Sequence, residues 1–412
     1  MTEWKTYRLG DVIDKVIDNR GKSAPTSDEK YSPIIEINSI GDRNPNYDVV
    51  RKWVSKGTYD TWFRSGHPMI GDILIPTVGT IGIVSIMREN KGCIAQNIVA
   101  LRTNEKAHNL YLYYFLKSEY VKQELLNLNI GGVQPSIKLP HLLNLEISLP
   151  SLEEQRRIAG ILGAIDDKIE NNRRINTNLE LQAQALYKQW FVNFEFPNEE
   201  GKPYKSSGGK MVDSELGLIP EGWSVGDIYK YVNVVYGAPY KSALFNERKD
   251  GNPLIRIRDL KTFSPQYYTQ EILPNTEFIN AGDVVAGMDA EFVPCLWMGE
   301  KGVLNQRCCK FVGKQDSISN YYVMFLVKPE LEFVQSYKTG TTVSHLGKSD
   351  IDKFLVVQPP LTVIEKFSKI ANALLNNKAN LAKENITLAS LRDTLLLKLM
   401  SGEIRVDDVS ID

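Results

Sequence analysis

The sequence predicts an α+β fold, in which two repeated globular domains are separated by two long helices packed as an antiparallel coiled coil. Two observations carry this prediction. The 412-residue chain resembles itself at an offset of 209 to 220 residues. Each copy is followed by a segment that contains no proline and that places apolar residues at seven-residue spacing. A chain of this length is also longer than one ordinary domain.

The repeat is visible in several short stretches. "SPIIEINSI" (32–40) aligns with "NPLIRIRDL" (252–260), and "GDILIP" from Gly71 aligns with "GDVVAG" from Gly282. Gln96 aligns with Gln306, and residues 131–152 align with residues 340–361. Because the offset drifts along the chain, we expect a shared framework whose surface loops differ in length. We assign one domain to residues 1–150 and its copy to residues 223–360.

Within each copy we expect short strands mixed with short helices. "PIIEINSI", "GDILIP" and "NIVALRT" have the apolar, β-branched composition of strands. "NLYLYYFLKSEYVKQELLNL" (109–128) has helical composition.

The segments after the copies, residues 151–194 and 361–401, are predicted to be the long helices. Their apolar residues repeat every seven positions, which is typical of a coiled coil. The predicted seam consists of Ile158, Leu162, Ile165, Ile169, Leu179 and Leu186 in the first helix and Phe367, Leu374, Leu381, Leu388 and Leu395 in the second. An alternative is that each helix is amphipathic and only caps its own domain.

Asparagines interrupt the seam and favour pairing of the two helices. Asn172 and Asn176 fall on the seam registers of the first helix, and Asn385 falls on a register of the second. A buried polar side chain costs free energy unless a partner satisfies it, so such residues fix the register of paired helices. Asn385 is a candidate partner. Antiparallel packing would place the two domains at opposite ends of the pair.

Two further segments complete the division of the chain. Residues 195–222 are rich in Pro, Gly, Ser and Lys, as expected of an exposed linker. Residues 402–412 form an acidic C-terminal tail.

No motif in the sequence predicts an enzyme active site. "GKS" occurs at Gly21 and at Gly347, but a phosphate-binding loop needs a glycine five residues earlier, where Val16 and Thr342 stand. The 4 cysteines and 4 histidines lack the spacing of a metal site, so we expect no metal. We interpret the cysteines as reduced thiols of a cytoplasmic protein, because the N-terminus lacks a signal peptide and no apolar run could cross a membrane.

Six motifs together resemble the specificity subunit of type I restriction-modification systems. They are "LPSLEEQRRIAGILGAIDDKI", "ALYKQWFVNFEFP", "SELGLIPEGW", "GAPYKSALFN", "PLIRIRDL" and "LLLKLMSGEI", and they span nearly the whole chain. The resemblance implies two target-recognition domains, each of which reads one half of a bipartite sequence in double-stranded DNA. It also implies that the helices fix the spacing and dock two methyltransferase (modification) subunits. The methyl donor, ATP and Mg would belong to partner subunits, with no cofactor in this chain. Whether restriction (translocase) subunits also bind stays open.

Loop and strand residues at matching places in the two copies are the candidates for DNA contact. They are Lys22, Ser23, Asn38, Arg43, Lys241, Ser242, Arg256 and Arg258. In the aligned stretches Ile35, Ile37 and Ile40 match apolar residues of the second copy, whereas the alternate positions differ. On a strand those alternate side chains would share one exposed face, as expected of domains that read different sequences. The alternative is an ordinary solvated face.

The balanced charge of the chain leaves alternatives to DNA recognition open. The chain carries 49 Lys and Arg against 50 Asp and Glu, which is a weak basicity for a protein that binds DNA alone. We therefore expect partner subunits to supply most phosphate contacts. A duplicated-domain scaffold that does not bind DNA is the main alternative, and an enzyme with an unrecognised site is a weaker one.

Overall fold

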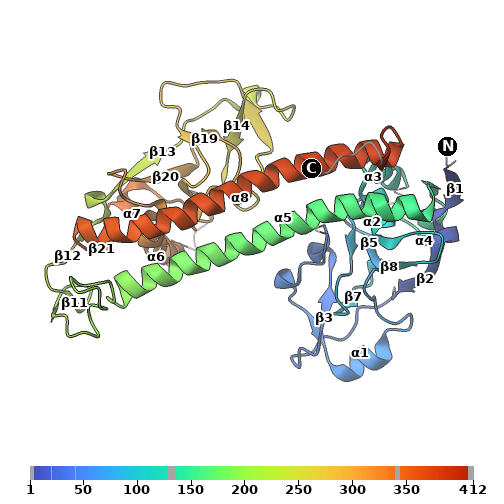
Figure 1. Cartoon of the computed structure of the whole chain (residues 1–412), viewed down its shortest axis with the longest axis horizontal. Coiled ribbons are helices and arrows are strands. Elements are labelled where there is room, and N and C mark those ends of the chain that lie inside the picture. The colour runs from blue at the N-terminus through green and yellow to red at the C-terminus, as the bar shows by residue number, and fades with distance from the viewer. Residues whose placement is uncertain (1–3, 20, 42, 129–134, 339–343, 407–412) are drawn as a thin grey trace. The chain divides into compact units, whose positions relative to one another are not determined.

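The computed structural model describes residues 4–19, 21–41, 43–128, 135–338 and 344–406 (Figure 1). The chain divides into two compact units, of which the first contains residues 1–169 and 388–412 and the second contains residues 170–387. Each unit therefore combines one copy of the repeat with part of both long helices. The sequence instead predicts separate domains for the copies and the helices.

The first copy is closed by its own ends. β1 (Lys5–Arg8) pairs antiparallel with β9 (Glu146–Leu149). Between them lie a four-stranded sheet of order β2-β8-β5-β6 and a three-stranded sheet of order β4-β3-β7. The strand bounds are β2 (Ile13–Asp18), β3 (Ser32–Ile35), β4 (Trp53–Val54), β5 (Ile73–Pro76), β6 (Ser85–Ile86), β7 (Cys93–Ile94) and β8 (Ile98–Thr103).

The helices of the first copy follow from capping residues and apolar composition. They are α1 (Lys56–Trp62), α2 (Asn109–Lys117), α3 (Glu119–Asn127) and α4 (Leu139–Leu143). The helix expected over residues 109–128 is divided at Ser118, whose Oγ accepts a hydrogen bond from the backbone N–H of Val121. Serine is a preferred N-cap residue, so it starts a new helix there.

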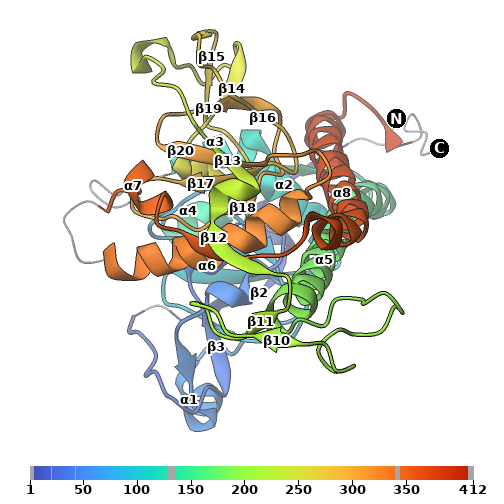
Figure 2. The ribbon, with the colours of Figure 1, turned by 90° about the vertical axis from the view of Figure 1, so that its left-hand side faces the viewer.

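The second copy repeats this arrangement. β12 (Ser224–Asp227) pairs antiparallel with β21 (Leu355–Gln358), and the sheets have the orders β13-β20-β17-β18 and β15-β14-β19-β16. The strand bounds are β13 (Val232–Tyr236), β14 (Asn252–Ile255), β15 (Tyr267–Thr269), β16 (Phe278–Ile279), β17 (Val284–Gly287), β18 (Cys295–Leu296), β19 (Gly302–Leu304) and β20 (Cys308–Gly313). α6 (Asn320–Lys338) packs against the first of these sheets (Figure 2), and the short α7 (Lys348–Ile351) follows it.

The expectation of a long strand at the aligned stretches is wrong. β3 and β14 end at Ile35 and Ile255, and each is followed by a 3-10 turn, Ile37–Ser39 in one copy and Ile257–Leu260 in the other. The alternate side chains therefore do not line one strand face. The burial pattern is nevertheless the same in both copies, since Ile35 and Ile255 are fully buried and the residues at 40 and 260 nearly so. The shared framework stands, although its local conformation differs from the prediction.

The two long helices are α5 (Leu152–Tyr187), which continues as a π-helical turn over Lys188–Val192, and α8 (Leu361–Ser401). Within the second unit they run antiparallel, because Asn172 of α5 contacts Asn385 of α8 and Glu180 contacts Lys378. Within the first unit Asp166 of α5 contacts α8. The α+β fold with an antiparallel helix pair is thus confirmed.

The segment expected to be an exposed linker, residues 195–222, is folded. It contains the antiparallel pair β10 (Met211–Val212) and β11 (Ile219–Pro220). Phe196 stacks between Tyr204 and Trp223, with ring centroids 4.7 and 5.0 Å away. Ile219 is buried in the core of the second unit. Aromatic side chains spaced through a Pro- and Gly-rich stretch supply the apolar contacts that composition alone did not reveal.

Candidate nucleic-acid interface

Four of the predicted DNA-contacting residues lie in exposed loops that follow the first long strand of each copy. Lys22 and Ser23 come after β2, and Lys241 and Ser242 come after β13. All four are exposed. The loop of the second copy is held by a hydrogen bond from the backbone N–H of Lys241 to Oε2 of Glu271, 2.8 Å long. The bond is made by the backbone of Lys241, so the side chain of this lysine takes no part in it.

The next two candidates lie on the 3-10 turns. Asn38 and Arg258 occupy equivalent turns in the two copies, and both are exposed. At this place one copy presents a neutral amide and the other presents a guanidinium.

Arg256 is held inside its own domain. Its guanidinium carbon lies 4.2 Å from the centroid of the Tyr267 ring, and its Nε is 3.6 Å from the carboxylate of Asp259. Nη2 donates to Oε1 of Gln266 over 3.3 Å. Only 18% of the side chain is exposed. These contacts fit a residue that braces the β14–β15 hairpin, so Arg256 is removed from the proposed contacts to bases.

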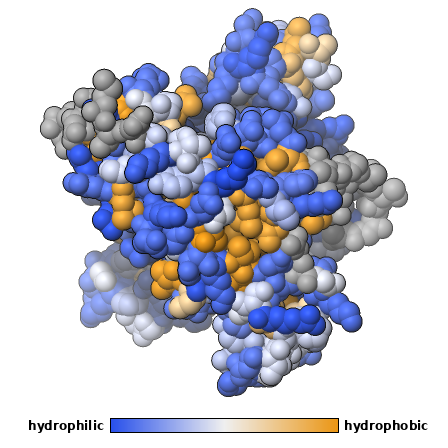
Figure 3. Space-filling model, turned by 90° about the vertical axis from the view of Figure 1, so that its right-hand side faces the viewer, coloured by the Kyte–Doolittle hydropathy of each residue, from blue (hydrophilic) through white to orange (hydrophobic). Residues whose placement is uncertain are grey.

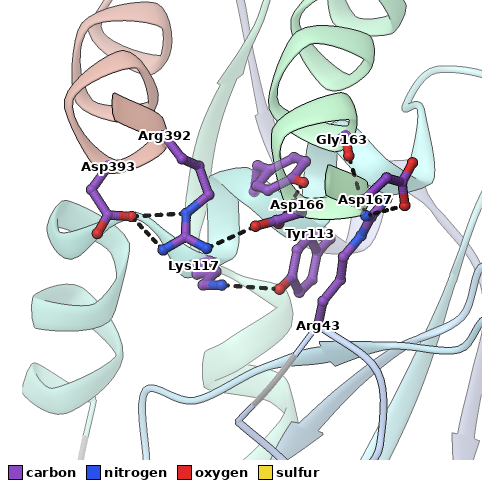
Figure 4. Close-up of polar contacts among 9 residues, drawn as sticks. Arg43, Tyr113, Lys117, Gly163, Asp166, Asp167, Arg392 and Asp393 are labelled. Atoms are coloured by element: carbon purple, nitrogen blue, oxygen red, sulfur yellow. Dashed lines mark hydrogen bonds and ion pairs between the residues drawn. The ribbon is translucent and has the colours of Figure 1, made fainter. Parts of the chain in front are cut away.

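Arg43 is also occupied by the fold. Its side chain is only 12% exposed, and Nη1 donates to Oδ1 of Asp167 over 2.7 Å and to the carbonyl oxygen of Gly163 over 3.3 Å (Figure 4). Arg88 approaches the same Asp167 oxygen at 3.1 Å. Arg43 thus ties the first copy to α5. These contacts occupy its guanidinium within the first unit.

A buried ion pair joins the long helices of the first unit. Nη1 of Arg392 donates to Oδ1 of Asp166 over 2.7 Å (Figure 4). The hydroxyl of Tyr114 donates to Oδ2 of Asp166, also over 2.7 Å. Burial opposes the charged form of Asp166, but the hydrogen bonds from Arg392 and Tyr114 outweigh it and lower its pKa. Tyr114 belongs to α2, so one carboxylate connects α5, α8 and the globular copy. We call Tyr114, Asp166 and Arg392 the buried triad.

The second unit has a different polar contact at the helix seam. Nδ2 of Asn172 donates to Oδ1 of Asn385 over 2.9 Å and to Oε2 of Glu384 over 2.8 Å. The expected partnership of Asn172 with Asn385 is therefore confirmed. Lys378, with a side chain that is 10% exposed, forms an ion pair with Glu180. A lysine is seldom buried without such a partner.

The predicted seam residues differ in their burial. Buried seam residues in the described chain are Ile158, Leu162, Ile169, Leu179 and Phe367. Partly buried ones are Ile165, Leu186, Leu374, Leu381, Leu388 and Leu395. In α8 the side chains one position later, Leu375 and Leu396, are more deeply buried. Leu374 and Leu395 instead pack at the edges of the globular cores.

Two polar seam residues of α8, Lys378 and Arg392, were missed by the sequence analysis, although a signal existed. Ala371, Lys378, Asn385, Arg392 and Leu399 follow one another at seven-residue spacing. Three of these five are polar, and each of the three contacts α5. A charged residue on a heptad register, with an opposite charge available on the other helix, predicts such a pair.

Each copy has the same loop frame at one end of its sheets. In the first copy Thr77 donates its backbone N–H to Asn97, Ile137 donates to Thr77, and Gly79 donates to Pro135, over 2.8 to 2.9 Å. In the second copy the matching bonds run from Met288 to Arg307, from Leu346 to Met288 and from Ala290 to Ser344, over 2.7 to 3.0 Å. Three loops distant in sequence therefore meet at equivalent places. We call this arrangement the loop frame.

The described residues offer no group of three or more His, Cys, Asp and Glu side chains that could hold a metal ion. Burial raises the pKa of Cys93, Cys295 and Cys309 to about 12, and that of Cys308 well above its ordinary value. A thiol with so high a pKa is a poor nucleophile at neutral pH. Among the described helices none is long and apolar enough to span a membrane.

Comparisons with known proteins identify the family. The model of the type I restriction modification DNA specificity domain matches residues 1–181 and 220–390, one match for each copy. The MjaIX specificity subunit of Methanocaldococcus jannaschii is 29% identical over 378 residues, which cover 82% of this chain and 79% of that protein. The EcoBI specificity subunit of Escherichia coli is 29% identical over 213 residues, 50% of this chain and 45% of that protein.

A solved structure shares the fold. The S subunit of a type I restriction-modification system from M. genitalium superposes with a TM-score of 0.56 and 16% identity, covering 97% of this chain and 96% of that one. The two matched regions of the family model coincide with the two copies of the repeat and the helices that follow them. The chain therefore belongs to the family of type I restriction-modification DNA specificity subunits, whose members are non-catalytic.

Proposed function

We propose that this chain reads a bipartite sequence in double-stranded DNA, with one copy of the repeat for each half-site. The observation that supports this most directly is the combination of a shared backbone frame with different exposed side chains. The closing strands, the loop frame and the order of the sheets agree between the copies, except that the second copy adds β16 to its second sheet. The turns nevertheless present Asn38 in one copy and Arg258 in the other. Amide and guanidinium groups prefer different base edges, adenine and guanine respectively.

We further propose that modification subunits dock on the long helices and supply the chemistry. Several large apolar side chains on these helices are exposed, namely Leu181, Ile370, Leu391 and Leu397. Figure 3 shows apolar side chains near the centre of one face of the molecule, surrounded by polar ones. Exposed apolar areas rimmed by polar residues mark sites of protein association. The methyl donor, ATP and Mg would be bound by partner subunits, two of them methyltransferases, with restriction subunits where the system has them.

The balanced charge of the chain supports assembly before tight DNA binding. With 49 basic against 50 acidic residues, the chain has few phosphate contacts to offer alone. The partner subunits would supply the remainder. Because the substrate is the DNA of the cell, we place this activity in the cytoplasm. The scaffold alternative, in which no DNA is bound, is distinguished by whether the assembled complex methylates a bipartite sequence.

Lys241 and Arg258 should have separable effects on DNA binding. Lys241→Ala removes a phosphate contact, so binding should weaken for all sequences and the salt slope should fall by about 1. Arg258→Ala removes a base contact, so discrimination at one position should fall by about 1–3 kcal/mol. Fluorescence anisotropy of the complex with its modification subunits, over a salt series, measures both. Lys202→Ala, at an exposed lysine of the 195–222 segment, is the control. Unchanged binding of both variants would contradict the assignment.

The length of the helices should set the gap between the half-sites. Residues 172–180 of α5 face residues 378–385 of α8. Inserting seven residues after Arg174 and seven after Leu381 preserves the heptad register and lengthens the helices by about 10 Å. The gap in the methylated sequence should grow by about 3 base pairs while both half-sites stay the same. Genome-wide mapping of methylated sites measures it. An active variant with the original gap would show that the helices do not set the spacing.

A further inference from the structure

The loop frame carries three side chains in each copy that differ completely in chemistry. Equivalent positions are fixed by the backbone, since Val78 bridges Ser136 in the first copy as Asp289 bridges His345 in the second. The N–H of Ala95 donates to Ile35 as that of Asn305 donates to Ile255, which makes Asn97 the counterpart of Arg307. The first copy therefore presents valine, asparagine and serine. The second presents aspartate, arginine and histidine.

In the second copy these three side chains form a connected cluster. Oδ1 of Asp289 lies 2.7 Å from Nδ1 of His345, and its Oδ2 lies 3.2 Å from Nη1 of Arg307. The side chains of Arg307 and His345 are 56% and 50% exposed, whereas that of Asp289 is 24% exposed. The carboxylate thus holds two exposed groups in fixed positions. We call Asp289, Arg307 and His345 the loop cluster.

α6 supports the loops that carry this cluster. Nε2 of Gln335 donates to the carbonyl of Ala290 over 2.9 Å, and Oε1 of Gln335 accepts from the N–H of Phe292 over 2.8 Å. Nζ of Lys338 donates to the carbonyl of His345 over 2.7 Å and to Asp350 over 2.6 Å. Ala290 adopts a φ of 61°, a strained conformation that such contacts must hold. Rigid support of this kind is what a recognition site needs.

The first copy has an unsatisfied polar atom at the matching place. Oδ1 of Asn97 is buried from solvent, and among the described residues it has no hydrogen-bond partner. A buried amide oxygen without a partner is costly, so packing within the described residues does not explain an asparagine at this position. The corresponding position of the second copy holds Arg307, which contacts Asp289 through Nη1, and a guanidinium group carries five N–H donors.

We propose that position 97 of the first copy and position 307 of the second read a base at equivalent places in the two half-sites. Arg307 would bind the O6 and N7 edge of a guanine, and Asn97 would bind the edge of an adenine. Asp289 is a positioning residue that orients Arg307. Exposed ion pairs add little to folding stability, so stability alone does not account for the cluster. The inference rests on the proposed reading of one half-site by each copy.

The substitution Arg307→Asn, which places the residue of the first copy in the second, tests this inference. The variant is co-expressed with the modification subunits of its own system, and methylated sites are mapped genome-wide. We expect the second half-site to lose its requirement for guanine at one position, with discrimination reduced by about 5- to 150-fold. The first half-site should be unchanged. Asp289→Val should relax the same position without lowering the melting temperature. Arg248→Asn, at a side chain of the same copy that is 84% exposed, is the matched control.

The other possible outcomes contradict specific claims or require a second measurement. If the complex that contains Arg307→Asn methylates only the original sequence, Arg307 does not read a base. The proposed function is unaffected by that result. If Arg307→Asn yields no methylation, binding of the purified complex to matched and singly substituted half-sites replaces the mapping. An equal loss for every sequence would then identify a phosphate or structural contact and overturn the inference. A wild-type complex that methylates no bipartite sequence would contradict the proposed function itself.

Discussion

Asp166→Ala is expected to lower the free energy of unfolding of the first unit by about 3–5 kcal/mol, because it leaves Arg392 buried without its partner. The ion pair spans 2.7 Å and both side chains are largely buried, with exposed fractions of 6% and 16%. Tyr114 would lose its acceptor at the same time. For a unit of this size the melting temperature should fall by on the order of 10 °C. Calorimetry of the purified chain measures the change.

The control for this prediction lies next to the same arginine. Asp393 also contacts Arg392, but 63% of its side chain is exposed. Asp393→Ala should therefore cost less than about 1 kcal/mol. The stabilisation that Asp166 gives to the wild-type protein should also depend on pH. Because its folded pKa is lowered, the stabilisation is present above the unfolded value of about 3.9 and is lost as the pH falls through the folded value. Equal effects of the two variants would show that burial of the triad adds nothing.

Exchange of the first copy for that of a relative should replace one half-site completely and leave the other unchanged. The physical reason is that each copy closes on itself through β1–β9 or β12–β21 and carries its own loop frame. Mapping of methylated sites in cells that carry the hybrid and the modification subunits measures both half-sites. The expected result is a hybrid sequence with one half from each parent.

The structure also indicates where the junction should lie. A junction at Pro150 keeps the native α5, so the donor copy must supply counterparts of Tyr114 and Arg43 for Asp166 and Asp167. A second hybrid that exchanges residues 1–169 carries those contacts with it. We expect the second hybrid to be at least as stable as the first. Loss of both half-sites in folded hybrids of both kinds would contradict independent reading.

Much of the architecture could be predicted because it depends on regular periodicity. The repeat and the two long helices follow from spacing, and Asn385 could be named as the candidate partner of Asn172. The antiparallel direction of the helices came from the topology and from the family resemblance, not from spacing. Within the predicted column of α8, Leu374 and Leu395 are only partly buried, at the edges of the two cores, whereas Phe367 is fully buried and lies 6.0 Å from the ring of Tyr187 in α5. A helix that buries two faces has two apolar columns. Sequence spacing does not distinguish between them.

The parts that escaped prediction depend on local or long-range contacts. The 3-10 turns after β3 and β14 arise from three-residue hydrogen bonds, such as that from the N–H of Arg256 to Oδ2 of Asp259. A short alternating stretch does not distinguish such a turn from a strand. Arg43 and Arg256 have the composition of DNA-binding residues, yet ion pairs with Asp167 and Asp259 occupy them. Asp167 lies far from Arg43 in the sequence, and Asp259 comes close to Arg256 only once the turn forms.

The division of the chain has a consequence for its synthesis. Residues 388–406 complete the first unit, but the ribosome makes them only after it has made the whole second unit. Until then Asp166 and Leu162 lack Arg392, Leu396 and Leu399, which share their core or their ion pair. The strands of the first copy can pair early. The face of α5 that packs against α8 stays uncovered until α8 has been made. The nascent chain therefore carries an unfinished apolar surface while the second unit is being made, and residues made after that unit complete the part that was begun first.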